Sequence, residues 1–211
     1  QVSALGVSGG WNPNIHLTCH QRGRPRWNAG LSAFVPSEEL PKGMHVAGAA
    51  NGHLTTAAAM KDAVAKTKLI TEGLGSMGKA PSALKTSEET SSISPFWYVR
   101  GTQRGWVDHQ NDVTVKDIEL AHQENFRSIE HLKRYTTLGM ATDQGKTSNV
   151  LGLAIMAQTA GQSIPEIGTT IYRPPYSPTA IGVFAGRSRD TDFRPVRKTP
   201  SHKWAEEQGA V

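Results

Sequence analysis

The stretch GMATDQGKTSN, residues 139–149, has a Gly-Lys-Thr sequence directly before a predicted helix. The phosphate-binding loop of nucleotide hydrolases has four residues between its first Gly and the Gly-Lys-Ser/Thr group, and it follows a strand. Here the five residues 140–144 separate Gly139 from Gly145, Met140 stands where the first Gly belongs, and the preceding segment predicts a helix. Both spacing and context therefore argue against a nucleotide hydrolase.

The same loop still has the chemistry of an anion site. Gly145 permits close backbone approach, Lys146 adds a positive charge, and Thr147 and Ser148 offer hydroxyl groups. The free N–H groups that open a helix point in the same direction. The alternative, which the spacing leaves open, is an ordinary capped helix start with a lysine facing solvent.

Other candidates for chemistry are weaker. His16, Cys19 and His20 form an H-x-x-C-H pattern, but three crowded ligands without a distant fourth make a poor zinc site, so packed or surface residues are expected. No Ser–His–Asp order or carboxylate pair stands out, and we predict no catalytic residue and no metal ligand. The single cysteine excludes an intrachain disulfide.

The bulk composition suits a loop-rich α/β chain. The 211 residues suffice for one or two domains, 37% are hydrophobic and 21 are Gly. The net charge is +5, with basic residues gathered in 187–203, which indicates either an anionic partner or a solvated basic surface. We find no nucleic-acid motif, no membrane-length apolar run and no signal peptide, and we expect a cytoplasmic protein.

The pattern along the chain predicts two kinds of structure. Residues 1–78 indicate α/β structure: a strand and Gly turn over 2–10, two apolar runs, and a long amphipathic helix over 52–75. Residues 79–106 are rich in Ser, Thr and Pro and predict a linker with an aromatic anchor at 96–98. A domain boundary is expected in this stretch.

Residues 107–162 predict a small domain of three helices. Thr114 with Asp117 forms a variant capping box for the first helix, and Ser128 caps the second. Gly139 is expected to stop the second helix, and Gly161 the third. Residues 163–211 are Pro-rich and predict irregular backbone.

The sequence of residues 108–154 closely resembles the α subunit of bacterial heterotetrameric sarcosine oxidase. Segments 7–17, 45–52, 168–186 and 193–211 match the same family in the same order. The resemblance implies an internal piece of a longer chain, cut at both ends. The family's Gly-rich dinucleotide fingerprint is missing from these residues, and so is most of its tetrahydrofolate-binding domain, which resembles the glycine-cleavage T protein.

The resemblance also implies the fold class. Residues 1–78 correspond to the C-terminal part of an NAD-binding α/β domain, the end of a fold of the two-dinucleotide-binding-domain type. After the 79–106 linker, residues 107–162 correspond to a helical domain related to bacterioferritin-associated ferredoxin without its cluster. Residues 163–211 correspond to a Pro-rich connection and the truncated start of the folate domain.

Three of the residues that match the family carry an expected NAD contact: Ala49, Leu54 and Thr56. They lie in HVAGAANGHLTT, which resembles the strand, turn and helix that close the NAD site. Small residues let the backbone approach the cofactor, and a helix N-terminus meets its polar groups. The alternative is a helix that is merely docked on a sheet.

The helical domain implies a lost iron–sulfur site. Asp108, Gln110, Asp143 and Ser148 align with the four cysteines of the iron–sulfur relatives. Because such clusters need thiolates, no iron–sulfur cluster is expected here.

The family holds FMN at the interface with its flavoprotein β subunit. We therefore predict that Gly145, Lys146 and Thr147 bind the FMN phosphate, with Arg134 or Lys133 nearby. The alternative is a purely structural contact with the β subunit.

The function implied by the resemblance is that of a sarcosine oxidase complex. It oxidatively demethylates sarcosine to glycine with peroxide formation, and it passes the one-carbon unit to tetrahydrofolate. The expected partners are the β subunit, which carries FAD, and smaller γ and δ subunits, with no nucleic acid and no membrane. The alternative is a non-catalytic interface segment of a related amine or opine oxidase or dehydrogenase complex.

Overall fold

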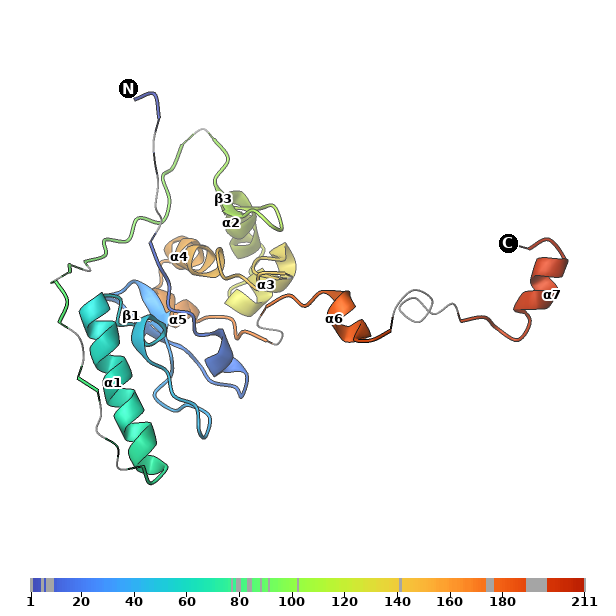
Figure 1. The fold of residues 1–211 in the computed structure, drawn as a ribbon. Coiled ribbons are helices and arrows are strands. Elements are labelled where there is room, and N and C mark those ends of the chain that lie inside the picture. The colour runs from blue at the N-terminus through green and yellow to red at the C-terminus, as the bar shows by residue number, and fades with distance from the viewer. Residues whose placement is uncertain are drawn as a thin grey trace. The chain divides into compact units, whose positions relative to one another are not determined.

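The chain forms two compact units in a computed structural model, Gln1–Tyr176 and Ser177–Val211 (Figure 1). The domain limits predicted at 78, 106 and 162 stay predictions. The structure describes residues 2–4, 6, 10–76, 78, 81–82, 85–87, 89–90, 92–101, 103–140, 142–173, 177–188 and 197–210.

A short antiparallel hairpin lies near the start of the first unit. β1 (Arg26–Asn28) pairs with β2 (Ala33–Val35), so that Trp27 stands opposite Phe34. Every residue of β2 is buried, and the Trp27 and Phe34 rings meet edge-on at 5.0 Å. The hairpin follows a 3-10 helix, η1 (His16–Cys19). The burial of β2 explains the apolar run over 31–35.

A second 3-10 helix, η2 (Gly48–Asn51), leads into the long helix α1 (Thr56–Gly73). The Thr55 hydroxyl caps α1 by accepting a hydrogen bond from the Ala58 amide at 3.3 Å. The helix was predicted, but none of its residues is buried. Its apolar side therefore adds nothing to the core of the described part of the chain.

One prediction for the N-terminal part was wrong, because the run before α1 does not lie in a strand. The strand predicted over 2–10 falls partly outside the described residues, since residues 5 and 7–9 are not among them. Gly48 and Gly52 have φ angles of 67° and 88°, and the Asp62 carboxylate accepts a hydrogen bond from the Gly48 amide at 2.9 Å. Backbone in the left-handed region turns the chain too sharply for a strand.

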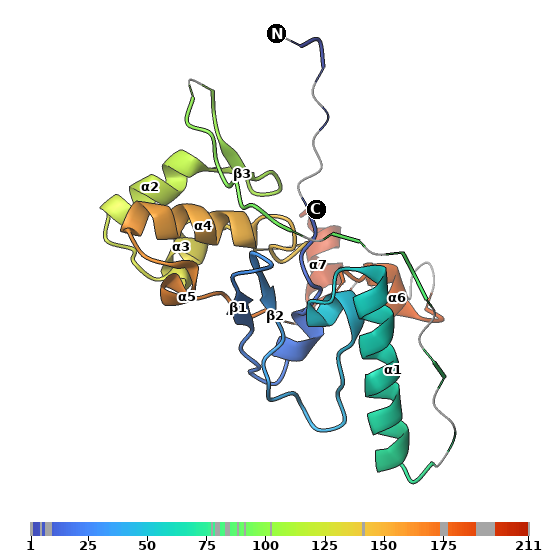
Figure 2. The same ribbon diagram turned by 90° about the vertical axis from the view of Figure 1, so that its left-hand side faces the viewer.

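The helical part of the first unit begins with a two-stranded ladder whose second strand runs into a helix. Its elements are β3 (Trp106–Asp108), β4 (Val113–Thr114), α2 (Val115–Gln123), α3 (Ile129–Thr136), α4 (Asn149–Ala160) and α5 (Ile164–Ile167). Figures 1 and 2 show α2, α3 and α4 side by side. The predicted group of three helices is confirmed.

The helix boundaries follow mostly from local capping. The capping box of Thr114 and Asp117 is present, and the Ser128 hydroxyl accepts a hydrogen bond from the His131 amide at 3.2 Å. Gly161 ends α4 in the left-handed conformation, as predicted. The predicted stop at Gly139 was wrong, because Thr137 already takes the left-handed C-cap position with φ of 63°.

The core lies where α2, α3 and α4 meet. Ile118, Leu132, Leu153 and Met156 are almost completely buried there, and Phe34 of the hairpin belongs to the same cluster. Burying a Leu or Ile side chain contributes about 1.5–3 kcal/mol. This cluster therefore fixes the positions of the loops that leave the three helices.

The second unit contains the short helices α6 (Ile181–Ala185) and α7 (His202–Glu207) in a segment that was predicted to be irregular. Glu206 of α7 forms ion pairs with Lys198 at 3.6 Å and with His202 at 3.5 Å. Among the helices in the described residues, none is both long and apolar enough to cross a membrane.

Candidate functional site

The 139–149 loop folds around the side chain at its own end. Gly139 and Gly145 both have left-handed backbone, with φ of 67° and 75°. A Cβ atom on either glycine would overlap the Asn149 side chain. The Asn149 side-chain amide donates a hydrogen bond to the Thr170 hydroxyl at 3.2 Å. This bond connects the 139–149 loop to the segment after α5. Both glycines are therefore required by packing within the chain.

A carboxylate of the chain accepts the hydrogen bonds that an external anion would need. The Asp143 carboxylate accepts hydrogen bonds from the Gly145 amide at 3.0 Å and the Thr147 hydroxyl at 2.9 Å. The Lys146 amide and ammonium group donate to the Asp143 carbonyl oxygen at 3.2 and 3.4 Å. These donors are therefore occupied by Asp143 of the loop itself, and the anion site stays a prediction.

A second carboxylate, that of Asp108, also forms hydrogen bonds with the 139–149 loop. Asp108, which is 1% exposed, accepts hydrogen bonds from the Gly139 amide at 2.9 Å and the Ser148 hydroxyl at 3.3 Å. It also accepts bonds from the amides of Gln110 and Asn111 at 2.9 and 3.2 Å. Burial by itself raises the pKa of Asp108, but these bonds to the ionised carboxylate outweigh burial and lower the pKa.

The four positions aligned with the cluster cysteines lie close together. Ser148 bonds to Asp108, and the Asp143 amide donates to the Gln110 side-chain oxygen at 3.1 Å. Hydrogen bonds thus join Asp108 to Ser148 and Gln110 to Asp143, while the relation to a ferredoxin stays a prediction. Within the described residues, no three His, Cys, Asp or Glu side chains come together as a metal site.

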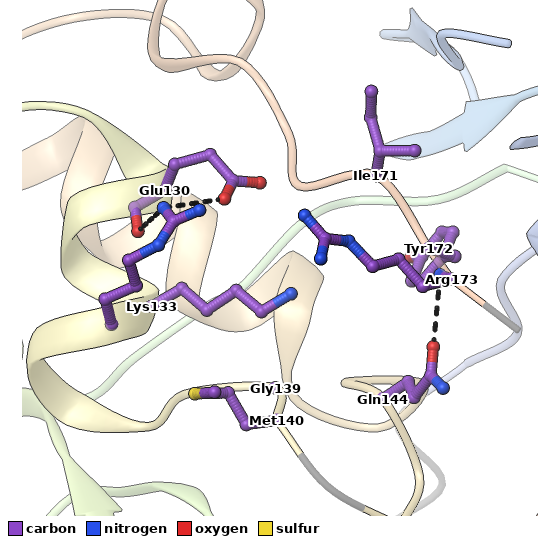
Figure 3. A pocket seen from close by; sticks show the side chains of 9 residues that line it. Glu130, Lys133, Gly139, Met140, Gln144, Ile171, Tyr172 and Arg173 are labelled. Carbon is purple, nitrogen blue, oxygen red and sulfur yellow. Dashed lines mark hydrogen bonds and ion pairs between the residues drawn. The ribbon is translucent and has the colours of Figure 1, made fainter. Parts of the chain in front are cut away.

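Two pockets flank the loop, and they divide the residues predicted around the FMN phosphate. One, of about 350 Å³, is lined by Lys133, Arg134 and Arg173 together with Gly139, Met140 and Gln144 (Figure 3). The other, of about 210 Å³, is lined by Gly145 and Lys146 together with His16, Phe34 and Tyr172. Lys133 and Arg134 thus line a different pocket from Gly145 and Lys146, and Thr147 lines neither.

His16 is a residue of the smaller pocket that sequence reasoning left as packed or exposed. It is buried, its ring lies 3.7 Å from that of Tyr172, and its Nδ1 is 3.0 Å from the Asn14 side-chain oxygen. Burial and the nearby Lys146 charge lower the pKa of His16 to about 4. His16 is therefore neutral at physiological pH, and Cys19 is buried with its pKa raised by burial.

The residues predicted to contact NAD lie together at the start of α1. Ala49 is exposed on η2, Leu54 is half-buried, and Thr56 is the first residue of α1. The Thr56 amide donates a hydrogen bond to the Glu89 carboxylate at 2.9 Å, and the Thr56 side chain together with this amide lowers the pKa of Glu89. The N-terminus of α1 therefore holds a negatively charged group from the chain itself.

Comparisons with known proteins point to one family. The family described as the Sarcosine oxidase A3 domain matches residues 102–187. Over the whole chain, the sarcosine oxidase subunit alpha of Rhizobium meliloti (strain 1021) is 42% identical, and those of Corynebacterium strains P-1 and U-96 are 37% and 35% identical. This chain is homologous to part of the sarcosine oxidase α subunit.

The chain spans about a fifth of the length of these sarcosine oxidase relatives, since it covers 22% of the first two and 23% of the third. A similar fold occurs in L-proline dehydrogenase from P. horikoshii. That structure has a TM-score of 0.57 with 18% identity, and the match covers 83% of this chain and 38% of the other. The mixed helical and strand architecture is thus shared with a dehydrogenase structure.

Proposed function

We propose that the chain is a segment of the α subunit of a sarcosine oxidase complex. The carrying observation is the similarity of all of its length to sarcosine oxidase α subunits at up to 42% identity. The complex would demethylate sarcosine to glycine with peroxide formation and pass the one-carbon unit to tetrahydrofolate. FAD and FMN, when bound, supply the redox chemistry. The groups that oxidise the amine lie outside this segment, whose role is to border cofactors and connect parts of the subunit.

The helical part is proposed to be a ferredoxin-related domain without its cluster. Supporting this, Asp108, Gln110, Asp143 and Ser148 lie close together and are joined in pairs by hydrogen bonds. Carboxylate, amide and hydroxyl groups are poor ligands for iron–sulfur clusters, which need thiolates. The hydrogen bonds of Asp108 and Gln110 to the 139–149 loop instead maintain the shape of this loop.

The 139–149 loop is proposed to border FMN at the interface with a flavoprotein β subunit. Gly145, Lys146 and Thr147 are the candidate phosphate contacts. Asp143 holds the Gly145 amide and the Thr147 hydroxyl, so phosphate binding there requires this carboxylate to move away. Lys146 tests the site: Lys146→Ala should lower the FMN-to-FAD ratio of the purified complex, while Lys116→Ala, an exposed lysine on α2, should not. Equal ratios in the two variants would refute this site.

The start of α1 is proposed to close an NAD site through Ala49, Leu54 and Thr56. Because Ala49 is exposed and small, Ala49→Trp should block the approach of the cofactor without disturbing the core. We expect the NAD content of the purified subunit to fall several-fold. Thr67→Trp, at an exposed position farther along α1, is the matched control and should keep its NAD.

The proposed partners are the FAD-carrying β subunit and the smaller γ and δ subunits, in the cytoplasm. Co-expression with the neighbouring subunits and purification through a tag on the complete α polypeptide tests the assembly. The competing function is a scaffold segment in a complex that oxidises another amine or an opine. That alternative predicts the same flavin-bearing assembly, with turnover on a different secondary amine and none on sarcosine.

A further inference from the structure

A row of three exposed arginines leads into the first hairpin. This arginine row (Arg22, Arg24 and Arg26) alternates with Gly23 and Pro25, and its last member is the first residue of β1. Proline favours extended backbone in the residue before it, so Arg24 and Arg26 both belong to an extended stretch. Side chains two positions apart in such a stretch lie on one side of the chain, roughly 7 Å from each other.

The backbone of the arginine row is fixed by its packing on η1. The Arg22 amide donates a hydrogen bond to the Cys19 carbonyl oxygen at 3.1 Å, and Arg22 has a left-handed φ of 67°. A Cβ atom on Gly23 would overlap the Thr18 carbonyl oxygen, so only a glycine allows this close approach. The arginines are therefore held in place before any partner arrives, which lowers the entropy cost of binding.

An apolar cleft of about 560 Å³ lies beside the arginine row, between the hairpin and the helical part. Figures 1 and 2 show β1 next to α5 at this place. Arg24 and Arg26 line the cleft, and together with Arg22 they also line a second hollow of about 590 Å³. The apolar lining of the cleft includes Trp27, Phe34, Ile129, Ile167 and Ile171. Two hollows of different character thus meet at Arg24 and Arg26.

Carboxylates of the chain compensate the arginine row only in part. The second hollow holds two exposed glutamates, Glu38 and Glu39, and Arg26 lies 3.8 Å from Glu38. Within the part of the chain that the structure describes, Arg22 and Arg24 form no ion pair. An exposed guanidinium is solvated by water, but one that another chain covers needs an opposite charge beside it. A segment that covers this row must therefore supply carboxylates.

The combination of charge and apolar surface separates this place from an ordinary solvated basic surface. Interfaces between subunits have an apolar centre and a polar rim, and Trp and Arg are enriched among the residues that contribute most to binding. The cleft with Trp27 supplies the centre here, and the arginine row supplies the rim. A contact within the core of one subunit would be less suitable, because buried arginines are tolerated there only when they are fully paired.

We propose that the arginine row and the adjoining cleft are the docking surface for an extended acidic segment of a partner subunit, which places an apolar side chain in the cleft. The inference rests on the proposed function for the presence of partner subunits. Carboxylates at alternate positions of such a segment match the spacing of Arg24 and Arg26, because both chains then repeat every two residues. Each guanidinium can bind a carboxylate through two parallel hydrogen bonds.

The first test measures how firmly the partner subunits are held. The complete α polypeptide is purified through a tag together with its partners, and the salt concentration that releases half of the partners is determined. This concentration should fall at least twofold when both Arg24→Glu and Arg26→Glu are present, and the pair Arg24→Lys and Arg26→Lys should recover part of the loss. Lys116→Glu, at an exposed lysine on α2, should behave as wild type does. Equal values in all of these complexes would overturn the proposal.

The second test identifies the chain that covers the cleft and does not depend on a weakened complex. Arg24 is replaced by the photo-reactive residue p-benzoylphenylalanine in the complete complex, and the cross-linked peptide is identified by mass spectrometry. We expect a partner-subunit segment in which Asp or Glu flanks an apolar residue, and no cross-link to that segment from the same probe at Lys116. Cross-linking only to the α polypeptide itself, or to no chain, would overturn the proposal. The expected cross-link in a complex that does not oxidise sarcosine would refute the proposed function and leave the docking surface standing.

Discussion

The carboxylate of Asp108 accepts a hydrogen bond from the amide of Gly139 at 2.9 Å, across 31 residues of sequence. The same carboxylate accepts a bond from the Ser148 hydroxyl at 3.3 Å, so it joins both ends of the loop that separates the two pockets. Asp108 is therefore the residue that fixes the distance between the end of α3 and the start of α4.

Replacement of Asp108 should destabilise the helical part strongly. Asp108→Ala leaves several buried donors without an acceptor, and each such donor costs about 1–3 kcal/mol. We expect the free energy of unfolding in urea to fall by about 2–4 kcal/mol. Asp112→Asn is a matched control at an exposed position with positive φ that Asn tolerates, and a change below about 0.5 kcal/mol is expected. Similar losses in the two variants would contradict the role of Asp108.

Substitution of a loop glycine by alanine should reduce stability more than the same substitution at a glycine that has similar backbone angles but no close neighbours. Gly145→Ala adds a Cβ atom at a φ of 75° and pushes it into Asn149, whereas Gly161 has a φ of 65° with nothing nearby. The left-handed backbone costs each alanine about 1–2 kcal/mol. Thermal unfolding should show a larger loss for Gly145→Ala than for Gly161→Ala. A loss of equal size would mean that Asn149 moves aside freely.

His16 should make the stability of the chain depend on pH below neutrality. Its pKa is lowered by burial to about 4 in the folded chain and is about 6.5 when exposed, so between these values the unfolded chain binds more protons. The free energy of unfolding should therefore fall as the pH drops from about 6.5 to about 4, by at most about 1.4 kcal/mol per pH unit. His16→Gln should reduce this slope, and His20→Gln, at an exposed site, should leave it unchanged. A slope that His16→Gln does not alter would exclude His16 as its source.

Local signals in the sequence predicted α2, α3 and α4 well, whereas the short helices α5, α6 and α7 lie in a segment that was predicted to be irregular. Thr114 with Asp117, Ser128 and Gly161 act through neighbours within one helical turn, so their roles can be inferred from spacing alone. Gly139 was misassigned because both it and Thr137 have left-handed backbone, and Thr137 comes first. Gly139 instead leaves room for the Asn149 side chain, because a Cβ atom there would overlap it. No rule based on neighbouring residues in the sequence predicts this.

The residues of the site were predicted less completely, because some of their contacts are long-range. The Gly-Lys-Thr sequence drew attention to Gly145, Lys146 and Thr147, and all three donate hydrogen bonds to Asp143 of the same loop, a local contact that was not predicted. Arg173 lies 40 residues from Lys133, and its place beside α3 follows only from the folded core.

The central claim is that this segment serves a complex that oxidises sarcosine with flavins. The most direct measurement mixes the assembled complex, purified with its partner subunits, with sarcosine in the absence of oxygen and follows the visible flavin absorbance. The account predicts that the flavin absorbance bleaches and returns when oxygen is admitted, with release of peroxide. A flavin spectrum that stays oxidised with sarcosine, yet bleaches with another secondary amine, would contradict the claim.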